Sequence, residues 1–278
     1  SCHIQKFGFT DSATFSKGFD GELTHRNSIG LANARMQPIL RFFWDATEDT
    51  MINQVQAALT SSIEMGLDLD TLTQRLQNTS FYPSLFANAF GDPLITPHRT
   101  AAAIGQFVRS MVSVNSKYDI GFIQSGMATM IEFPNYTDQE NLGKSLFFSS
   151  EAACATCHVD HNFAAFQPQN NGLDLVYNDK GLGEKTGFAD HMAMFKAPPL
   201  RNIGLTAPYM HDGRFKTLEE VVEHYNSGIQ DHPNLGSSLK TFVQGQGHIP
   251  KRLNLSTEEK AALVAFLETL TDPYFTRD

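Results

Sequence analysis

The residues Cys154-Ala155-Thr156-Cys157-His158 form the strongest chemical motif of the sequence. Two thiols separated by two residues and followed at once by a histidine are typical of a c-type haem attachment site. Each thiol adds to one vinyl group of the porphyrin, and the histidine then lies under the iron as its ligand. A zinc site would need two further ligands at suitable spacing, and the sequence has no second cysteine pair. We therefore predict a covalently bound haem with His158 on its iron.

The third cysteine stands at the start of the sequence, in Ser1-Cys2-His3. These residues look like the last three of a second Cys-X-Ser-Cys-His site whose first cysteine lies upstream. The alternative is a free thiol beside a surface histidine, and the three residues alone leave both interpretations open. If the second site is real, we expect the sequence to be a chain truncated at its start, so that a missing signal peptide says nothing about compartment. Three cysteines also rule out a disulfide framework.

Length and composition limit the class of protein. At roughly 100–200 residues per domain, 278 residues indicate two domains or one large one. A hydrophobic fraction of 41% and a charged fraction of 18% are typical of a globular chain. The net charge of −9 argues against nucleic-acid binding and permits a basic protein partner. The apolar runs are too short for a membrane span. The 22 phenylalanines suggest a core packed around something flat and apolar.

Helical patterning dominates the chain, and we find no convincing strand alternation. Apolar spacing, capping boxes at Thr137–Glu140 and Ser256–Glu259, and a proline suited to a first helical position predict the helices. They are expected at 49–59, 68–76, 81–90, 96–112, 137–148, 217–225 and 256–270. We expect residues 117–134 to be a linker. Residues 159–200 read as a long loop, which in a compact domain is normally functional or wrapped around a ligand.

Taken in order, several segments resemble the bacterial dihaem cytochrome c peroxidase family, including its MauG-like branch. The resemblance covers essentially the whole chain. It rests on His25-Arg26-Asn27-Ser28, Phe43-Trp44-Asp45, Gln54 with Glu64-Met65-Gly66, the Cys154–His158 motif, Pro199-Leu200-Arg201-Asn202 and Leu205-Thr206-Ala207-Pro208-Tyr209-Met210-His211-Asp212-Gly213.

The resemblance implies an all-α fold of two cytochrome c-type domains, each around one covalently attached haem. Residues 1–125 would hold the peroxidatic haem, and residues 126–278 the electron-transfer haem. On this resemblance Cys2 and His3 belong to a true haem site, with His3 as the iron ligand. The implied cofactors are two covalently bound haem c groups and a calcium ion.

The resemblance also assigns roles around the first haem. Glu64 matches the catalytic carboxylate of the distal pocket, with Gln54 as its hydrogen-bonding partner. A carboxylate buried in an apolar pocket has a raised pKa, which suits general acid–base catalysis near neutrality. Trp44, the only tryptophan, would carry electrons between the two haems, although its type alone also fits a core residue. Without the family, Glu64 and Gln54 would be read as solvated residues.

Other family positions concern ion and propionate binding. Asn27 and the backbone carbonyls of Thr206 and Pro208 match the calcium site between the haems, and calcium prefers such oxygen ligands. From its residue type alone, Asn27 equally fits a turn. Arg201 could pair with a haem propionate, because its guanidinium fork suits a carboxylate, although a surface position is the commoner one for an arginine.

The sequence departs from the family at the iron ligands. Many members place a histidine over the first iron, some sixteen residues past the first haem histidine. Phe19 stands there in this chain, and His25 is the nearest alternative. We therefore predict that the first haem is five-coordinate and active without reductive activation.

The second ligand of the His158 iron is open between two side chains. Met210 is attractive from the sequence alone, because His/Met ligation is common in cytochromes c. Family spacing points instead to Tyr225, where MauG-like proteins carry a tyrosine, and His224 is a further alternative. An anionic oxygen ligand stabilises oxidised iron, whereas thioether sulfur favours the ferrous state.

The resemblance implies an enzyme that reduces hydrogen peroxide at an open N-terminal haem, while the second haem stores or relays oxidising equivalents through Trp44. Its partner would be a small electron donor, a cytochrome c or a cupredoxin. The alternatives are a MauG-like oxidase that modifies side chains of a partner protein, and a dihaem electron carrier without enzyme activity. We expect a periplasmic location, no membrane span and no nucleic-acid partner. The oligomeric state stays open, with a homodimer among the options.

Overall fold

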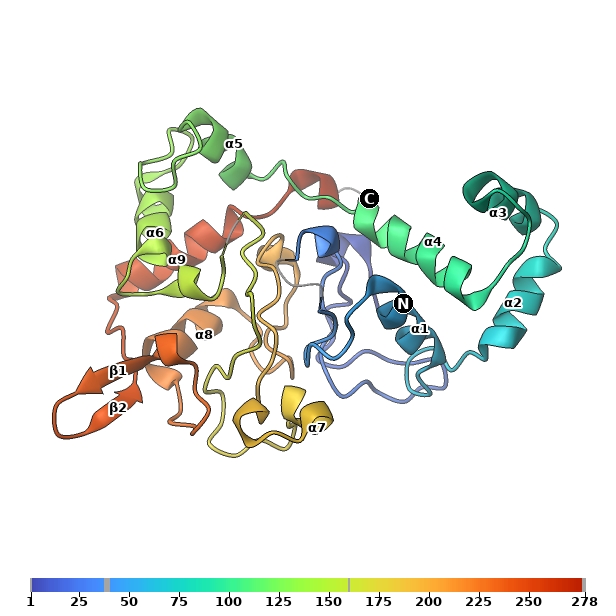
Figure 1. Ribbon diagram of the computed structural model, residues 1–278. Helices are drawn as coiled ribbons and strands as arrows, with labels where there is room; N and C mark the ends of the chain where they lie inside the picture. The colour runs from blue at the N-terminus through green and yellow to red at the C-terminus, as the bar shows by residue number, and fades with distance from the viewer. Residues whose placement is uncertain (1, 38–40, 160, 277–278) are drawn as a thin grey trace.

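The computed structural model describes residues 2–37, 41–159 and 161–276. Figure 1 shows two lobes, with the helices of the N-terminal part on one side and those of the C-terminal part on the other. The helices are α1 (Met51–Thr60), α2 (Leu69–Gln77), α3 (Tyr82–Phe90), α4 (Pro97–Ser110), α5 (Lys117–Gln124), α6 (Asp138–Phe148), α7 (Leu182–Thr186), α8 (Leu218–Glu223) and α9 (Thr257–Glu268).

The helices expected from the sequence are present, with small shifts at their ends. Both expected capping boxes form, because Thr137 and Ser256 each accept the backbone N–H three residues later while a glutamate bonds back. Pro97 occupies the first turn of α4, after the capping residue Thr96. Local sequence signals therefore define most of the helical framework.

The expectation of an all-α chain needs one correction. Strands β1 (Lys240–Val243) and β2 (Gly247–Pro250) form an antiparallel hairpin that projects from the C-terminal lobe (Figure 1). Gly245 and Gly247 have φ values of 82° and 79°, which let the chain reverse at the turn. Four-residue strands are too short to show clear alternation, which is why the sequence pattern missed them.

The expected linker at 117–134 is also wrong in part. Its first half is α5, which begins with a capping box between Ser116 and Asp119. Tyr118 on this helix is 1% exposed and packs within the C-terminal core. The helix is too short and its apolar periodicity too weak to be recognised in sequence, since its stability comes from that packing. The domain boundary at residue 125 stays a prediction.

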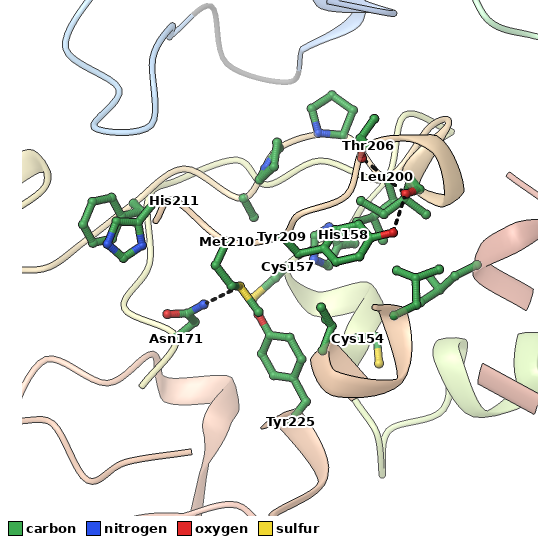
Figure 2. Close-up of a pocket in the computed structure, with 18 of the residues that line it drawn as sticks. Cys154, Cys157, His158, Asn171, Leu200, Thr206, Tyr209, Met210, His211 and Tyr225 are labelled. Carbon is green, nitrogen blue, oxygen red and sulfur yellow. Dashed lines mark hydrogen bonds between the residues drawn. The ribbon is translucent and has the colours of Figure 1, made fainter. Parts of the chain in front are cut away.

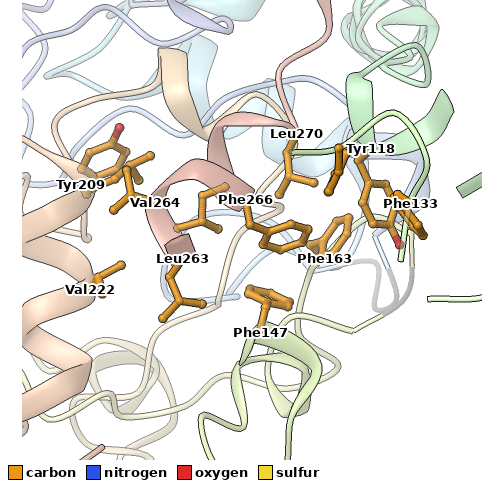
Figure 3. Packing of buried hydrophobic residues seen from close by; sticks show 13 residues of the cluster. Tyr118, Phe133, Phe147, Phe163, Tyr209, Val222, Leu263, Val264, Phe266 and Leu270 are labelled. Carbon is orange, nitrogen blue, oxygen red and sulfur yellow. The ribbon is translucent and has the colours of Figure 1, made fainter. Parts of the chain in front are cut away.

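The C-terminal core is an aromatic cluster beside α6 and α9. Phe133, Phe147, Phe163 and Phe266 are each at most 3% exposed and contact one another or Tyr118 edge-on or tilted (Figure 3). Such aromatic pairs stabilise by about 0.5–1.5 kcal/mol beyond their burial. The many phenylalanines thus build a rigid wall on which the rest of the lobe is assembled.

The N-terminal core is smaller and lies between α1 and α4. Met51, Val55 and Leu59 of α1 face Ala101 and Val108 of α4. Helices α2 and α3 extend from this core, and only Phe86 among their residues is buried.

The two lobes repeat one backbone arrangement. Asn33 and Asn202 both have left-handed φ values, 58° and 64°, just before a short 3₁₀ turn. Each amide oxygen accepts the backbone N–H of a residue that follows the last helix of its lobe, Ser113 or Asp272. The repeated bond fixes the loop of each lobe to its last helix, at equivalent places.

The close crossing of α6 and α9 leads to a prediction about stability when Gly143 gains the methyl group of an alanine. A Cβ at Gly143 would lie 1.8 Å from the carbonyl oxygen of Ala262, a backbone atom that cannot move aside. We expect Gly143→Ala to lower the free energy of unfolding by about 1–3 kcal/mol, as overpacking does. Chemical denaturation followed by circular dichroism measures it.

Gly105→Ala on α4 is the control, because its Cβ would meet a side-chain atom, Cγ of Met51 at 2.9 Å, and no backbone atom of another helix. It should change stability much less. Equal stability of Gly143→Ala and the wild type would contradict the close helix crossing.

Candidate haem sites

A large cavity lies between the Cys154–His158 turn, the loop at 195–203, helix α8 and helix α9. Most of the side chains that line it are apolar, among them Phe147, Leu200, Leu218, Val222, Leu263 and Leu267. Cys154, Cys157 and His158 lie in its wall, and Tyr225 and Met210 reach into it from other elements (Figure 2). Thiols, an imidazole and an apolar lining are what a covalently bound haem requires, so the residues fit that cofactor.

The ring of His158 is held by a single hydrogen bond to the core. Its Nδ1 lies 2.9 Å from the carbonyl oxygen of Phe163, which fixes Nδ1 as the donor. Burial lowers the pKa of His158 and keeps the imidazole neutral. The other nitrogen, Nε2, is therefore left with a free lone pair, which is the form that ligates a metal.

The two thiols are presented by a tight turn. Ala153 has a left-handed φ of 55°, and the 3₁₀ turn Cys154–Thr156 follows it. Both thiols are free, and burial raises the pKa of Cys154 to about 12. The turn holds Cys154 and Cys157 beside His158 on one side of the cavity, as attachment to two vinyl groups demands.

Tyr225 reaches the cavity from an irregular helical turn. Helix α8 ends at Glu223 and continues as a π-helical turn over His224–Gly228, an irregularity that is frequent at functional sites. Burial raises the pKa of Tyr225 to about 12, and a hydrogen bond with Asn171 opposes this. His224 donates to the carbonyl of Asn171 through Nε2, at 3.0 Å, and is not part of the cavity lining.

Met210 lies close to Tyr225 in the same cavity (Figure 2). The side-chain amide of Asn171 donates to its sulfur at 3.4 Å. Asn171 thus bonds both Met210 and Tyr225. Of the three candidate ligands from the sequence, the structure thus brings Tyr225 and Met210 to the cavity and directs His224 elsewhere.

His3 repeats the geometry of His158. Its Nδ1 lies 2.7 Å from the carbonyl oxygen of Phe9, as that of His158 does from Phe163. Both phenylalanines have left-handed φ values, 63° and 53°, and the residue after each histidine forms an antiparallel bridge. A histidine held in this way has the tautomer that suits an iron ligand, so Cys2-His3 has local structure of the same kind as Cys157-His158.

Glu64 and Phe19 lie together in the N-terminal lobe. The backbone N–H of Phe19 donates to the carbonyl of Glu64 at 3.0 Å, and its ring covers Gly66. Glu64 is half-buried in the turn after α1, and this burial raises its pKa. Gln54 is half-buried on α1. His25 is exposed.

Trp44 joins the lobes at the edge of the cavity. Its indole N–H donates to the carbonyl of Asn27 at 2.8 Å, and its own carbonyl accepts the backbone N–H of Lys196 at 2.7 Å. The ring also contacts His211 edge-on, with 6.5 Å between centroids. The structure therefore brings Trp44 to the wall between the N-terminal lobe and the cavity.

The three predicted calcium ligands line one part of the same cavity. The amide nitrogen of Asn27 donates to the carbonyls of Ala13 and Thr14, which turns its oxygen the other way. Thr206 and Pro208 belong to the 206–213 segment and line the same cavity. Neutral oxygens of this kind fit a calcium ion. Within residues 2–37, 41–159 and 161–276, no group of three or more acidic, histidine or cysteine side chains could hold a metal.

Arg201 is buried at the cavity but already has a carboxylate partner. Its guanidinium donates to Asp119 at 2.8 Å, to the hydroxyl of Ser116 and to the carbonyl of His161. The guanidinium thus holds α5 against the core, and its pairing with a propionate stays a prediction.

Sequence reasoning missed three cavity residues: Asn171, Lys196 and His211. His211 is 5% exposed and stacks on Phe195, with 3.8 Å between ring centroids. None of them stands in a spacing that signals chemistry. In sequence, only their position within the long 159–200 loop or the Thr206–Gly213 segment hinted at them.

The comparisons agree with this geometry. The sequence matches the family described as di-haem cytochrome c peroxidase over residues 1–125 and 137–270. It is 32% identical over 275 residues to the methylamine utilization protein MauG of Methylorubrum extorquens, covering 97% of this chain and 71% of that protein. It is 29% identical over 276 residues to the cytochrome c551 peroxidase of Nitrosomonas europaea, covering 98% and 73%.

Solved structures show the same fold. A crystal structure of a MauG-like protein associated with microbial copper homeostasis has a TM-score of 0.83 and 30% identity, covering 100% of this chain and 84% of that one. The diheme peroxidase BthA from Burkholderia thailandensis has a TM-score of 0.77 and 21% identity, covering 99% and 81%. In the described part of this chain, no helix is long and apolar enough to cross a membrane.

The raised pKa of Glu64 makes a prediction about stability. A carboxyl whose pKa is higher in the folded state destabilises the fold once pH rises above its ordinary value of 4.5. We expect Glu64→Gln to be as stable as the wild type below that pH. Near neutrality it should be slightly more stable, by less than about 1 kcal/mol because water screens a half-buried group. Urea denaturation at two pH values measures this, and a less stable variant at neutral pH would show that Glu64 has a structural role.

Proposed function

Because the chain belongs to the di-haem cytochrome c peroxidase family, we propose that it reduces hydrogen peroxide at an open haem held by Cys2 and His3. A second haem, on Cys154, Cys157 and His158, stores or relays the oxidising equivalents. The chain is thus an oxidoreductase that acts on peroxide.

The observation that carries this proposal is the paired geometry of His3 and His158. Each histidine follows a cysteine and donates Nδ1–H to the carbonyl of a phenylalanine with a left-handed φ. Two unrelated surface histidines would not be expected to share this geometry. With this bond, each ring keeps Nε2 as an electron-pair donor. This shared geometry supports a haem site at Cys2 and His3.

When bound there, the haem supplies the iron at which the peroxide bond is reduced. The chain's own part is to move a proton between the two peroxide oxygens. Glu64 can take a proton from one oxygen and return it to the other, and its raised pKa brings it closer to the working pH. Gln54 orients the carboxyl, and Phe19, which has no ligating atom, leaves the iron position open.

Trp44 connects this chemistry to the second haem. It is the only tryptophan of the chain, lies at the cavity edge and is bonded to both sides of the lobe interface, through Asn27 and Lys196. We assign it the transfer of electrons between the haems, and we assign the oxygens of Asn27, Thr206 and Pro208 to a calcium ion beside it.

Tyr225 is the proposed second ligand of the His158 iron. It reaches into the cavity from the π-helical turn after α8, at the position that the family spacing indicates. An oxygen ligand favours oxidised iron, so this haem would be a poor acceptor from a high-potential donor and would hold an oxidising equivalent well.

This ligand favours a second candidate function, the oxidation of side chains in a partner protein. The 32% identity to a MauG protein agrees with it. In the first function the partner is a small electron donor, a cytochrome c or a cupredoxin, and in the second it is the protein substrate. For either we propose a periplasmic location.

The peroxidase proposal is tested with Glu64→Gln. We expect its peroxide-dependent oxidation of a reduced donor to fall by about 10²- to 10⁴-fold, the usual contribution of general acid–base catalysis. Steady-state kinetics with reduced small cytochromes measure this. Glu22→Gln, the same change at an exposed position, should keep full activity. Full peroxide turnover by Glu64→Gln with both haems attached would contradict the role of Glu64. A wild type with both haems and no peroxide turnover would leave only the electron-carrier function.

The ligand proposal is tested by near-infrared spectroscopy of the oxidised protein. We expect the wild type to lack the sulfur-to-iron charge-transfer band that a methionine ligand produces. Tyr225→Phe should change the spectrum of one haem, whereas Met210→Leu should leave it unchanged. A sulfur band in the wild type that disappears in Met210→Leu would assign Met210 instead, and would favour the electron-accepting peroxidase over the oxidase of protein side chains.

A further inference from the structure

Lys196 is a buried cation that the proposed function does not use. It is 4% exposed and lines the cavity of the His158 site. Burial lowers its pKa to about 8. Its backbone N–H donates to the carbonyl of Trp44, so the residue stands at the junction of the lobes.

The ammonium group of Lys196 is poorly satisfied by the described protein atoms. It donates to the carbonyl of Arg41 at a long 3.3 Å, and no salt bridge to it is found among residues 2–37, 41–159 and 161–276. Asp45 acts on it electrostatically, but the oxygens of Asp45 are bound by Arg26 and Thr47. A buried charge without a partner is costly, so an anion from the cavity side would complete this site.

Lys144 is a buried lysine whose ammonium group has good hydrogen-bond acceptors within the protein. It is 3% exposed, and its ammonium donates to the carbonyls of Thr129 and Ile131 at 2.6 and 2.7 Å. It also lies 4.4 Å from the ring centre of Phe133. Lys144 does not line the cavity. Two lysines of similarly small exposed fraction thus differ in their hydrogen-bond acceptors and in their access to the cavity.

The other cations at the cavity are accounted for. Arg201 has Asp119 as its carboxylate partner. Lys251 acts electrostatically on the thiol of Cys154, so it lies on the side where the porphyrin is attached. The acidic groups of a haem are its propionates, and these lie on the edge opposite the attached vinyl groups. Lys196, which comes from the wall shared with Trp44, is the cation left to meet them.

We propose that Lys196 forms the ion pair with a propionate of the haem on His158, in the place first expected for Arg201. This rests on the proposed haem at that site. The pair holds the porphyrin edge against the turn that carries Trp44, so one residue fixes both the haem and the backbone of the interhaem tryptophan. A cation beside a propionate also stabilises the reduced, less positive haem.

The test is a redox titration of the holoprotein, which measures the midpoint potential of each haem. We expect Lys196→Met to lower the potential of the His158 haem and to leave that of the other haem nearly unchanged. Lys196→Arg should restore it, because the positive charge returns. Lys196→Gln, which keeps a donor for Arg41 but has no charge, should lower the potential as Lys196→Met does, and it serves where the methionine variant folds poorly.

Lys144→Met is the matched control, expected to lose stability without a shift in either potential. An unchanged potential of the His158 haem in both neutral variants, or a shift in the other haem alone, would overturn the ion pair. The haem count of each sample, from the pyridine haemochrome, keeps the two proposals apart. Fewer than two haems per chain contradicts the dihaem function, while the potential of the His158 haem still decides the role of Lys196.

Discussion

The hydrogen bond between His158 Nδ1 and the carbonyl of Phe163 is the contact on which the site depends. Phe163 has no exposed surface and packs against Tyr118, Phe147 and Phe266, so the histidine is anchored directly to the rigid aromatic core. A rotation of the imidazole would break a buried hydrogen bond, which costs about 1–3 kcal/mol. The core therefore fixes both the direction of the iron-binding nitrogen and its protonation.

The same device in the N-terminal lobe, at His3 and Phe9, gives two similar histidine sites whose surroundings differ. One faces a cavity into which Tyr225 and Met210 project. The other lies in the lobe that carries Glu64, the proposed proton-transferring group, and Phe19, a ring without a ligating atom. In the proposed enzyme the same histidine geometry thus serves two different tasks. The other residues of each site, and not the histidine, decide whether the iron has a second protein ligand or an open position.

The junction between the lobes is built from backbone bonds around Trp44. Asn27 accepts its indole N–H, and Lys196 donates to its carbonyl. Arg26, next to Asn27, binds Asp45 of one lobe and Asp179 of the other. Because these backbone groups and the Arg26 guanidinium are paired across the lobes, the tryptophan has a fixed position, which suits the electron transfer proposed for it. A propionate on Lys196 would extend that network to the cofactor.

The sequence by itself determined the Cys154–His158 motif, the main helices and their caps, since these depend on residues at most four positions apart. It also indicated Glu64, Trp44 and Tyr225, through resemblance to a family. Only the tertiary structure decided that α5 belongs to the C-terminal core, that Arg201 is bound by Asp119 and that Lys196 is buried at the cavity. These features depend on contacts between residues tens or hundreds of positions apart. Distant residues supply the hydrogen-bond and ion-pair partners of a lysine or arginine, so the sequence around it carries no pattern that reveals them.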